Sequence, residues 1–474
     1  METLNIEYNV GKKCACLTGM FVDLVKEHFS VPNKGAYFAK KLGYRNVPSR
    51  LYAITNAGNF GVGMIPRVVE FCKQSQIPYT IDEKLNPILY PSIYDGKLYN
   101  VTNTQFTLRD YQEECIIKTL KQGRGLLVVG TGGGKTLITS TLIENFYQRS
   151  QDKKKFKCLM IVPDLGLVRQ TYDEFNKFGT SFTVTKFTGQ NQPDLNCNCI
   201  IANSQILLHL DEHDKWIKDI DLLIVDEVHK IKKGNKITKL VNKIKTLNRI
   251  GCTGTLPTDK IDLWSIIANF GDIVYEKPSS ELRNEHFLTD VKSYILHLKY
   301  SKPYYFKFQQ ELEFLMNHEG RNNLIHKIAS KCANNILILV NYIEHGEILY
   351  EKLKNIEGKQ VFFVQGSVDV DDRAEIIKKM EESDNVVCIA ISAIFSTGIN
   401  IKNLHTMIFA AGGKSAIRMI QSIGRGLRLH SNKKQFSVID LADDLKYGNE
   451  HIEERKKIYD SEKIPYEEKD VVVE

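Results

Sequence analysis

The sequence lacks the features of membrane, secreted and disordered proteins. Its longest apolar runs, such as LLVV and NILILV, have the length of a buried strand, whereas a membrane-spanning helix needs about 20 apolar residues. The N-terminal METLNIEYNV shows no positive-then-apolar signal pattern. There is no repeat or low-complexity tract, and hydrophobic residues make up 42% of the chain. These absences predict a folded cytoplasmic protein with no membrane partner.

Metal-binding cysteine patterns are also scarce. The ten cysteines include only two C-x-C pairs, Cys14/Cys16 and Cys197/Cys199, and the C-x2-C spacing common in zinc sites is missing. An extended strand places the two residues of such a pair on one face by default. Most of the remaining cysteines fall in apolar segments, so we expect buried thiols, with zinc binding at the two pairs as the alternative.

Charge of one sign is not dominant. The 474 residues allow two to four domains, and the formal net charge is +7. This modest basic excess permits nucleic-acid binding but is too small to indicate it alone.

A glycine-rich loop follows an apolar strand at residues 126–136, which read LLVVGTGGGKT and lead into an amphipathic helix. Backbone N–H groups of such a loop converge on phosphates, the lysine reaches the β and γ phosphates, and the threonine hydroxyl can bind Mg²⁺. Val129 stands where the strict motif has its first glycine. The sequence predicts an ATP site formed by Gly130, Thr131, Gly132, Gly133, Gly134, Lys135 and Thr136.

An acidic pair follows a second apolar strand, in the segment DLLIVDEVH at residues 221–229. We expect Asp226 to hold Mg²⁺ through water and Glu227 to polarise the attacking water, as phosphoryl transfer requires. A helix N-cap would explain one carboxylate but not two. His229 is weaker evidence, because a lone histidine is more often structural.

Two α/β units are indicated by strand-like runs that alternate with helical stretches. In the first unit, Thr107 can cap a helix that places Arg109 and Gln112 on the adenine side of the loop, where a glutamine can read the base. The strand-like runs span 157–163, 198–203 and 248–254 in the first unit, and 335–340, 360–365, 385–392, 405–410 and 436–440 in the second.

The second unit has no P-loop but contains QSIGRGLR at residues 421–428. Gln421, Arg425 and Arg428 fall at i, i+4 and i+7, which is one face of a helix. One interpretation is an exposed basic face. The other is a pair of arginine fingers that reach ATP across a cleft between the units.

Taken together, LRDYQ, GTGGGKT, VPDLGLVRQ, FTGQ, DEVH, TGT, FSTGIN and QSIGRGLR resemble, in order, the motifs of superfamily 2 helicases and translocases over residues 105–445. The segment from FSTGIN to LRLH looks most like the phage-encoded UvsW-type helicases, which would place the protein in a host cytoplasm. This resemblance implies ATP-driven translocation on DNA, usually 3′ to 5′, with branch migration and fork regression in recombination, repair or replication.

The resemblance also implies roles for individual residues. Gln112 would read adenine, Lys135 and Thr136 would bind phosphate and Mg²⁺, and Asp226 and Glu227 would be the catalytic acids. His229, Thr253 and Thr255 would couple hydrolysis to DNA, although many relatives have SAT where this chain has TGT. The residues that would track the DNA backbone, without regard to base sequence and with strong salt dependence, are Pro163, Arg169, Thr188, Gly189, Ser204 and Thr397.

The expected architecture is α/β, with two tandem RecA-like motor domains of doubly wound parallel sheet and a small N-terminal α/β domain. We expect an accessory domain at 1–104, motor domains at 105–282 and 283–448, and a charged tail at 449–474. The first segment carries twelve lysines and arginines against eight acidic residues. Its exposed Tyr44, Arg45 and Arg50 could grip duplex DNA, but a packing domain or a protein dock is the alternative.

The implied partners are forked or four-way DNA and proteins of recombination or replication, bound by a monomer. An RNA helicase is the main alternative, although DEVH and Gln421 differ from DEAD-box RNA helicases, which have DEAD and usually a histidine. A P-loop kinase or transport ATPase would leave the second unit unexplained. A binding module with an inactive ATP site is disfavoured because every catalytic residue type is present.

Overall fold

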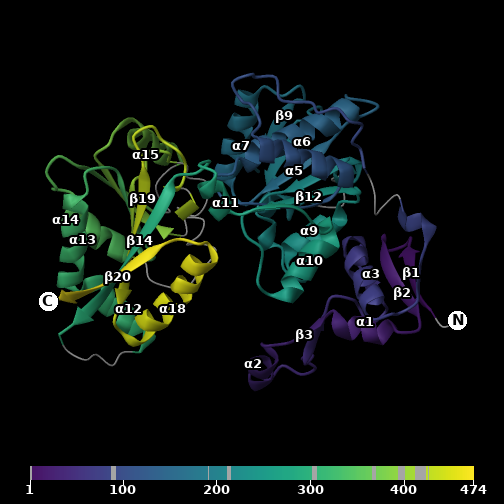
Figure 1. Ribbon diagram of the computed structural model, residues 1–474, viewed down its shortest axis with the longest axis horizontal. Helices are drawn as coiled ribbons and strands as arrows, with labels where there is room; N and C mark the ends of the chain where they lie inside the picture. The colour runs from purple at the N-terminus through teal and green to yellow at the C-terminus, as the bar shows by residue number, and fades with distance from the viewer. Residues whose placement is uncertain are drawn as a thin grey trace. The chain divides into compact units, whose positions relative to one another are not determined.

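The computed structural model describes residues 3–86, 92–189, 192–210, 215–301, 307–365, 370–392, 401–410, 423–424 and 426–474. The chain divides into two compact units (Figure 1). The first comprises Met1–Val129 and Gly134–Glu276, and the second comprises Gly130–Gly133 and Lys277–Glu474.

The first unit is built on a seven-stranded sheet with the strand order β13-β7-β12-β11-β8-β10-β9. The strands from β7 to β9 in that order pair in parallel, and four of them are buried along their whole length, as expected for a sheet covered on both faces. The predicted apolar strands are confirmed. In chain order the strands are β7 (Gly125–Val129), β8 (Cys158–Val162), β9 (Val184–Phe187), β10 (Cys199–Asn203), β11 (Leu222–Val225), β12 (Asn248–Thr253) and β13 (Ile273–Lys277).

Helices connect these strands, and the first of them, α5, begins at an N-cap that the sequence did not predict. Arg109, not Thr107, is the N-cap of α5, and the Arg109 backbone N–H donates to Gln112 Oε1 at 3.0 Å. This reciprocal capping explains why Gln112 is buried in the first turn. The helices are α5 (Asp110–Gln122), α6 (Lys135–Arg149), α7 (Leu165–Phe178), the short α8 (Ser204–Leu207), α9 (Lys236–Lys243) and α10 (Lys260–Phe270).

The N-terminal segment forms a four-stranded sheet with the order β5-β2-β1-β6, and the predicted mixture of strands and helices is confirmed. Figure 1 shows this sheet in purple beside α1 and α3. The elements are β1 (Leu4–Asn9), β2 (Cys14–Gly19), α1 (Val22–His28), β3 (Ser30–Pro32), α2 (Ala36–Lys41), β4 (Arg50–Tyr52), β5 (Asn59–Phe60), the 3-10 turn η1 (Val62–Met64), α3 (Ile65–Gln74) and β6 (Tyr79–Ile81).

The N-terminal segment shares one hydrophobic core with the first motor sheet, so it packs on the motor as well as carrying charge. The two parts pack tightly at Gly63, where an added Cβ would lie 2.0 Å from Ile267 O of α10. Arg67 of α3 also joins the segment to the motor through two hydrogen bonds to Asp272, at 2.6 and 2.7 Å. The packing alternative is therefore correct for this face, and DNA contact by the segment stays a prediction.

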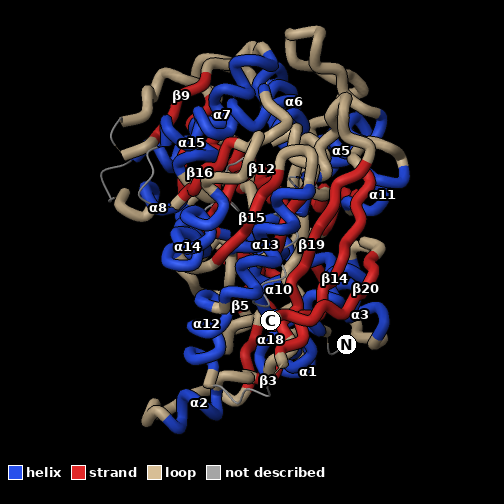
Figure 2. The backbone as a smooth tube through the Cα atoms, turned by 90° about the vertical axis from the view of Figure 1, so that its left-hand side faces the viewer, coloured by secondary structure: helices blue, strands red, loops and turns tan. Residues whose placement is uncertain are grey.

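The second unit contains another seven-stranded sheet, with the order β16-β17-β15-β18-β19-β14-β20 and parallel pairing throughout. The five predicted strands are confirmed, and β14 and β20 extend the sheet beyond them, as the red segments of Figure 2 show. The strands are β14 (Asp290–Tyr300), β15 (Ile336–Val340), β16 (Gln360–Val364), β17 (Val386–Ile391), β18 (Thr406–Phe409), β19 (Gln435–Asp443) and β20 (Tyr466–Val473).

Residues 449–474, expected to be a charged tail, are instead part of this fold. They form most of α18 (Lys446–Ser461) and all of β20, whose register with β14 runs from Ser293↔Tyr466 to Tyr300↔Val473. The remaining helices of the unit include α11 (Ser279–Asn284), α12 (Phe308–Asn317), α13 (Glu319–Lys331), α14 (Ile343–Leu353) and α15 (Val370–Glu382). None of the helices in the described ranges is long and apolar enough to cross a bilayer.

Candidate ATP-hydrolysis site

The glycine-rich loop begins where β7 ends and leads directly into α6, as predicted. Gly132 and Gly134 have φ of 86° and 76°, which side-chain-bearing residues rarely adopt. A Cβ on Gly134 would lie 2.3 Å from Gln112 Nε2. The loop therefore needs glycine at this position for both backbone conformation and space, and the Gln112 amide lies against it.

Lys135 is the first residue of α6 and is half-buried. Its Nζ donates to the carbonyl oxygen of Val129, the last residue of β7, at 3.0 Å. The ammonium is thus held at the end of the strand, on the loop that is suited to phosphate. Thr136 follows it in the first turn of the same helix, also half-buried.

Asp226 and Glu227 directly follow β11. The Asp226 backbone N–H donates to Ile161 O at 2.9 Å, and the Glu227 N–H donates to Asp226 Oδ1 at the same distance. Glu227 has φ 50° and ψ 48°, a left-handed conformation that costs a non-glycine residue about 1 kcal/mol or more. Such strain persists where surrounding contacts fix the residue, which is common at catalytic positions.

The two carboxyl groups have opposite pKa shifts. Burial, together with the negative charge of Glu227, raises the pKa of Asp226. Burial would also raise the pKa of Glu227, but the His229 hydrogen bond and the Lys135 charge outweigh it and lower that pKa. Glu227 is therefore a stable carboxylate that can accept a hydrogen bond from water. A nearby cation would further favour the ionised form of Asp226.

This donor set fits Mg²⁺. No cluster of three or more His, Cys, Asp or Glu side chains that could enclose a metal occurs in the described ranges. Mg²⁺ is commonly bound by only one or two protein oxygens, with water and nucleotide phosphates completing the octahedron. The Thr136 hydroxyl and the Asp226 carboxylate are the two protein oxygens that would serve here.

His229 connects the acidic pair to the TGT segment. Its Nδ1 lies 3.1 Å from Glu227 Oε2 and 2.9 Å from Thr253 Oγ1. The Thr253 hydroxyl donates its single proton to Thr255 O at 2.7 Å, so its oxygen must accept from the imidazole. The proton of a neutral His229 therefore sits on Nδ1. The structure brings all three predicted coupling residues into one hydrogen-bonded chain that begins at Glu227.

The residues expected to track a nucleic-acid backbone gather at one edge of the first sheet. Pro163 follows β8, Thr188 and Gly189 follow β9, and Ser204 follows β10, three strands that are neighbours in the sheet. Gly189 is exposed, and its φ of 81° favours glycine. Arg169 is an exposed residue of α7, which also starts from this edge. Thr397 lies outside the described residues.

Of the predicted arginine-finger helix, Gln421 and Arg425 lie outside the described residues. Arg428 is described and half-buried, and its backbone oxygen accepts from Thr289 Oγ1 at 3.0 Å. The roles of these three residues in ATP hydrolysis stay predictions.

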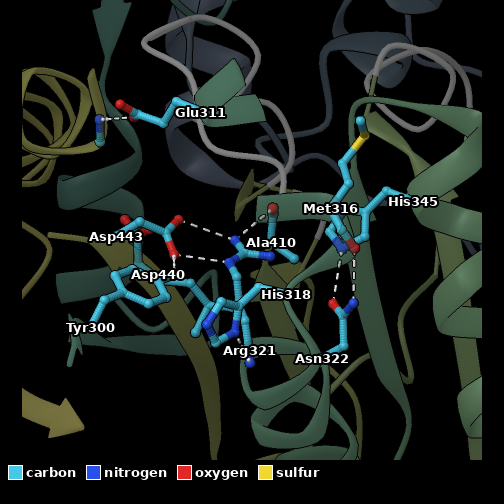
Figure 3. A network of polar contacts seen from close by, with 12 residues as sticks. Tyr300, Glu311, Met316, His318, Arg321, Asn322, His345, Ala410, Asp440 and Asp443 are labelled. Atoms are coloured by element: carbon cyan, nitrogen blue, oxygen red, sulfur yellow. Dashed lines mark hydrogen bonds and ion pairs between the residues drawn. The ribbon is translucent and has the colours of Figure 1, made fainter. Parts of the chain in front are cut away.

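The second unit contains a buried polar network that the sequence did not predict (Figure 3). Arg321 of α13 is 1% exposed and is bonded to Asp443, at the end of β19, and to Ala410 O, just after β18. Tyr300 OH donates to Asp443 Oδ1 at 2.7 Å. Nothing in the helical pattern around Arg321 distinguishes it from a solvent-exposed arginine, because its partner lies 122 residues away.

A P-loop after β7, an acidic pair after β11, two strands away in the same sheet, and a second seven-stranded sheet in the other unit are the parts of an ATP-dependent helicase of superfamily 2. Family models agree with this assignment. Residues 105–258 match "Type III restriction enzyme, res subunit", and residues 320–430 match "Helicase conserved C-terminal domain".

Among individual proteins, the chain is similar to the ATP-dependent DNA helicase UvsW of Enterobacteria phage T4, with 25% identity over 90% of this chain and 88% of that protein. It is also similar to the DNA 3′-5′ translocase XPB2 of Sulfurisphaera tokodaii, with 24% identity over 71% of this chain and 82% of that one. The structure of S. cerevisiae Dbp5 bound to RNA and ADP BeF3 shares the fold, with a TM-score of 0.57, 18% identity and coverage of 77% and 89% of the two chains.

Proposed function

We propose that this helicase acts on branched DNA, regressing forks, migrating branches and unwinding arms during recombination, repair or replication. The observation that carries the proposal is the similarity to UvsW over 90% of the chain, which includes the N-terminal segment as well as the two motor sheets. The preferred substrates are forks and four-way junctions, bound by a monomer, and proteins of recombination or replication are the expected partners. The particular pathway depends on which of these partners the cell supplies.

The first step is ATP capture on the loop between β7 and α6. Gln112 lies against the loop and reads the adenine edge, with Arg109 beside it, while Lys135 exchanges its bond to Val129 O for the β and γ phosphates. Mg²⁺, held by Thr136 and Asp226, would neutralise phosphate charge. The raised pKa of Asp226 fits this role, because a neighbouring cation favours the carboxylate.

Hydrolysis is assigned to Glu227, whose carboxylate is kept ionised by His229 and Lys135 and can orient the attacking water. Arg425 and Arg428 supply positive charge to the transition state, with Gln421 on the same helix face. His229 Nδ1 contacts both Glu227 and Thr253, so a change in the hydrogen bonds of Glu227 alters the bond between His229 and Thr253. Thr253 is in turn bonded to Thr255 O, so the change extends to the TGT segment.

DNA contact is assigned to the edge where β8, β9 and β10 end, through Pro163, Thr188, Gly189 and Ser204, with Arg169 and Thr397 completing the track. Contacts of this kind address the backbone, so they should be independent of base sequence and weakened by salt. The proposed polarity is 3′ to 5′, by analogy with the XPB2 translocase.

ATP hydrolysis measured in parallel with single-stranded DNA, duplex, forks, four-way junctions and RNA of matched sequence tests the proposal. We expect forks and four-way junctions to stimulate turnover most and RNA least. Stronger stimulation by RNA would instead support the alternative that this protein is an RNA helicase. The RNA-bound Dbp5 structure shares the fold of this chain. Equal stimulation by all DNA forms would retain a DNA motor but overturn the preference for branches.

A further inference from the structure

A cleft of about 510 Å³ lies within the first unit, between the N-terminal segment and the α9–α10 face of the motor sheet. Its walls come from the β1–β2 turn, the segment from β4 to η1, and both helices. None of its described lining residues is an aspartate or a glutamate. Five lysines line it instead, two from the β1–β2 turn and three from the motor: Lys12, Lys13, Lys233, Lys239 and Lys245.

Two arginines complete the lining. Arg124 is 6% exposed and donates to the carbonyl oxygens of Phe270 and Asn269, at 3.1 and 3.0 Å. Arg249 donates to Thr246 O at 2.9 Å. Burial lowers the pKa of Arg124 to about 9 and that of Arg249 to about 10. Capping of helix ends explains these arginines. Of the lysines, Lys245 likewise donates to Asn242 O, in the last turn of α9, at 2.7 Å, and Lys233 donates to Tyr52 O of the N-terminal segment. Among the described residues, no such bond accounts for Lys12, Lys13 or Lys239.

The lysines are exposed, and none of the five makes an ion pair within the part of the chain that the structure describes. Burial, with the charge of Arg249 and Lys13, lowers the pKa of Lys245. Cations from two separate parts of the chain therefore converge without a carboxylate. Such an arrangement is repulsive on its own and is relieved by a bound anion.

The cleft is separate from the ATP site. Arg124 immediately precedes β7, and Arg249 is the second residue of β12, so both mark the amino-terminal edge of the parallel sheet. The phosphate loop follows the opposite, carboxyl-terminal end of β7, as do Pro163 and Ser204 on their strands. Neither the nucleotide nor the DNA track assigned above accounts for these cations.

We propose that this cleft binds the phosphates of a second segment of DNA, gripped between the β1–β2 turn and α9. The inference rests on the proposed function, since it takes a DNA substrate as given. Half-buried Tyr8 and Trp264 line the same cleft and offer aromatic surface to bases. The spread of cations over several elements suits a strand better than a single free phosphate.

The test compares two charge reversals of equal size. Lys12→Glu/Lys245→Glu places one change on each wall, while Lys236→Glu/Lys243→Glu changes two exposed lysines of α9 that do not line the cleft. Binding of forked DNA is measured by fluorescence anisotropy between 50 and 200 mM salt. We expect the slope of log affinity against log salt to become shallower by about 2, and binding to weaken by about tenfold or more, only in the first variant.

Lys12→Gln/Lys245→Gln should give a smaller loss in the same direction, which separates lost contacts from misfolding. Equal binding by the two reversed variants, with DNA-stimulated hydrolysis intact in the parent, overturns the cleft assignment and leaves the proposed function standing. A parent that binds no DNA overturns both. A loss of inorganic tripolyphosphate binding with unchanged DNA binding overturns the assignment to DNA in favour of a free polyanion.

Discussion

Arg321 Nε lies 2.9 Å from Asp443 Oδ1, and the two side chains are only 2% and 4% exposed (Figure 3). The same guanidinium donates to Ala410 O at 3.2 Å. One arginine thus ties the first turn of α13 to the ends of β18 and β19. The hydrogen bond to Ala410 O therefore holds the residue that directly follows β18.

Removing one member of this buried pair should be costly. Arg321→Leu leaves the Asp443 carboxylate buried without its cation, and we expect the free energy of unfolding of the second unit to fall by about 3–5 kcal/mol. Urea denaturation of the full chain measures it. Arg321→Leu/Asp443→Leu should recover part of the loss, and Lys327→Leu, at an exposed position of the same helix, should change stability little. If Arg321→Leu and Lys327→Leu have the same free energy of unfolding, the structural role of Arg321 is wrong.

Glu227→Gln should retain ATP binding and lose hydrolysis by about 10²-fold or more, since an amide cannot accept a proton from water. ATP affinity and steady-state turnover are measured separately on forked DNA. Lys230→Gln changes a nearby exposed residue and is the matched control. Turnover close to the parental rate would assign the base to another residue.

Arg425→Ala and Arg428→Ala should each reduce DNA-stimulated turnover by about 10³-fold or more while affecting ATP affinity much less, because arginine fingers meet charge that develops in the transition state. Lys434→Ala removes an exposed cation from the same region and should be close to the parent. If both arginine variants keep parental turnover, the helix is only a basic surface.

Acid should destabilise the second unit partly through His345. Burial lowers its pKa to about 3, with a smaller contribution from Arg321, whereas a histidine in the unfolded chain titrates near 6.5. Between these values the unfolded state binds the proton and the native state does not, so stability falls as pH decreases below about 6.5.

His345→Gln should therefore make the free energy of unfolding less steep in pH, by up to about 1.4 kcal/mol per pH unit over this range. Urea titrations at several pH values measure the slope. His326→Gln, on α13, is the control for losing a histidine elsewhere in the unit. An unchanged slope in His345→Gln would show that His345 does not contribute.

Gly63→Ala should loosen the N-terminal segment, because the new Cβ would lie 2.0 Å from Ile267 O. We expect faster proteolysis of the first hundred residues and reduced fork remodelling, with DNA-stimulated ATP hydrolysis largely kept. Gly35→Ala, where the nearest atom is 3.5 Å away, is the matched control. Full fork remodelling by Gly63→Ala despite faster proteolysis would show that docking of this segment is not needed.

The sequence by itself determined the strands and turns that are specified by residues next to one another in the chain. An apolar run of strand length before GTGGGKT or before DEVH specifies a buried strand that ends in a functional turn, so the positions of Lys135, Asp226 and Glu227 on their elements followed from neighbouring residues. Five strands of each sheet were predicted for the same reason, whereas β9, β13, β14 and β20 were not. Thr107 was misassigned as a cap because capping depends on where the first turn begins, and the pair Arg109 and Gln112 competed for that position.

Only the tertiary structure decided which distant residues meet. The Arg321–Asp443 pair, the pairing of β20 with β14, the shared core beneath Gly63 and the approach of Lys12 to Lys245 each join segments far apart in the chain. Periodicity records which face of an element is apolar, but not which partner covers it. The opposite pKa shifts of Asp226 and Glu227 arose in the same way, since burial and the positions of His229 and Lys135 set them.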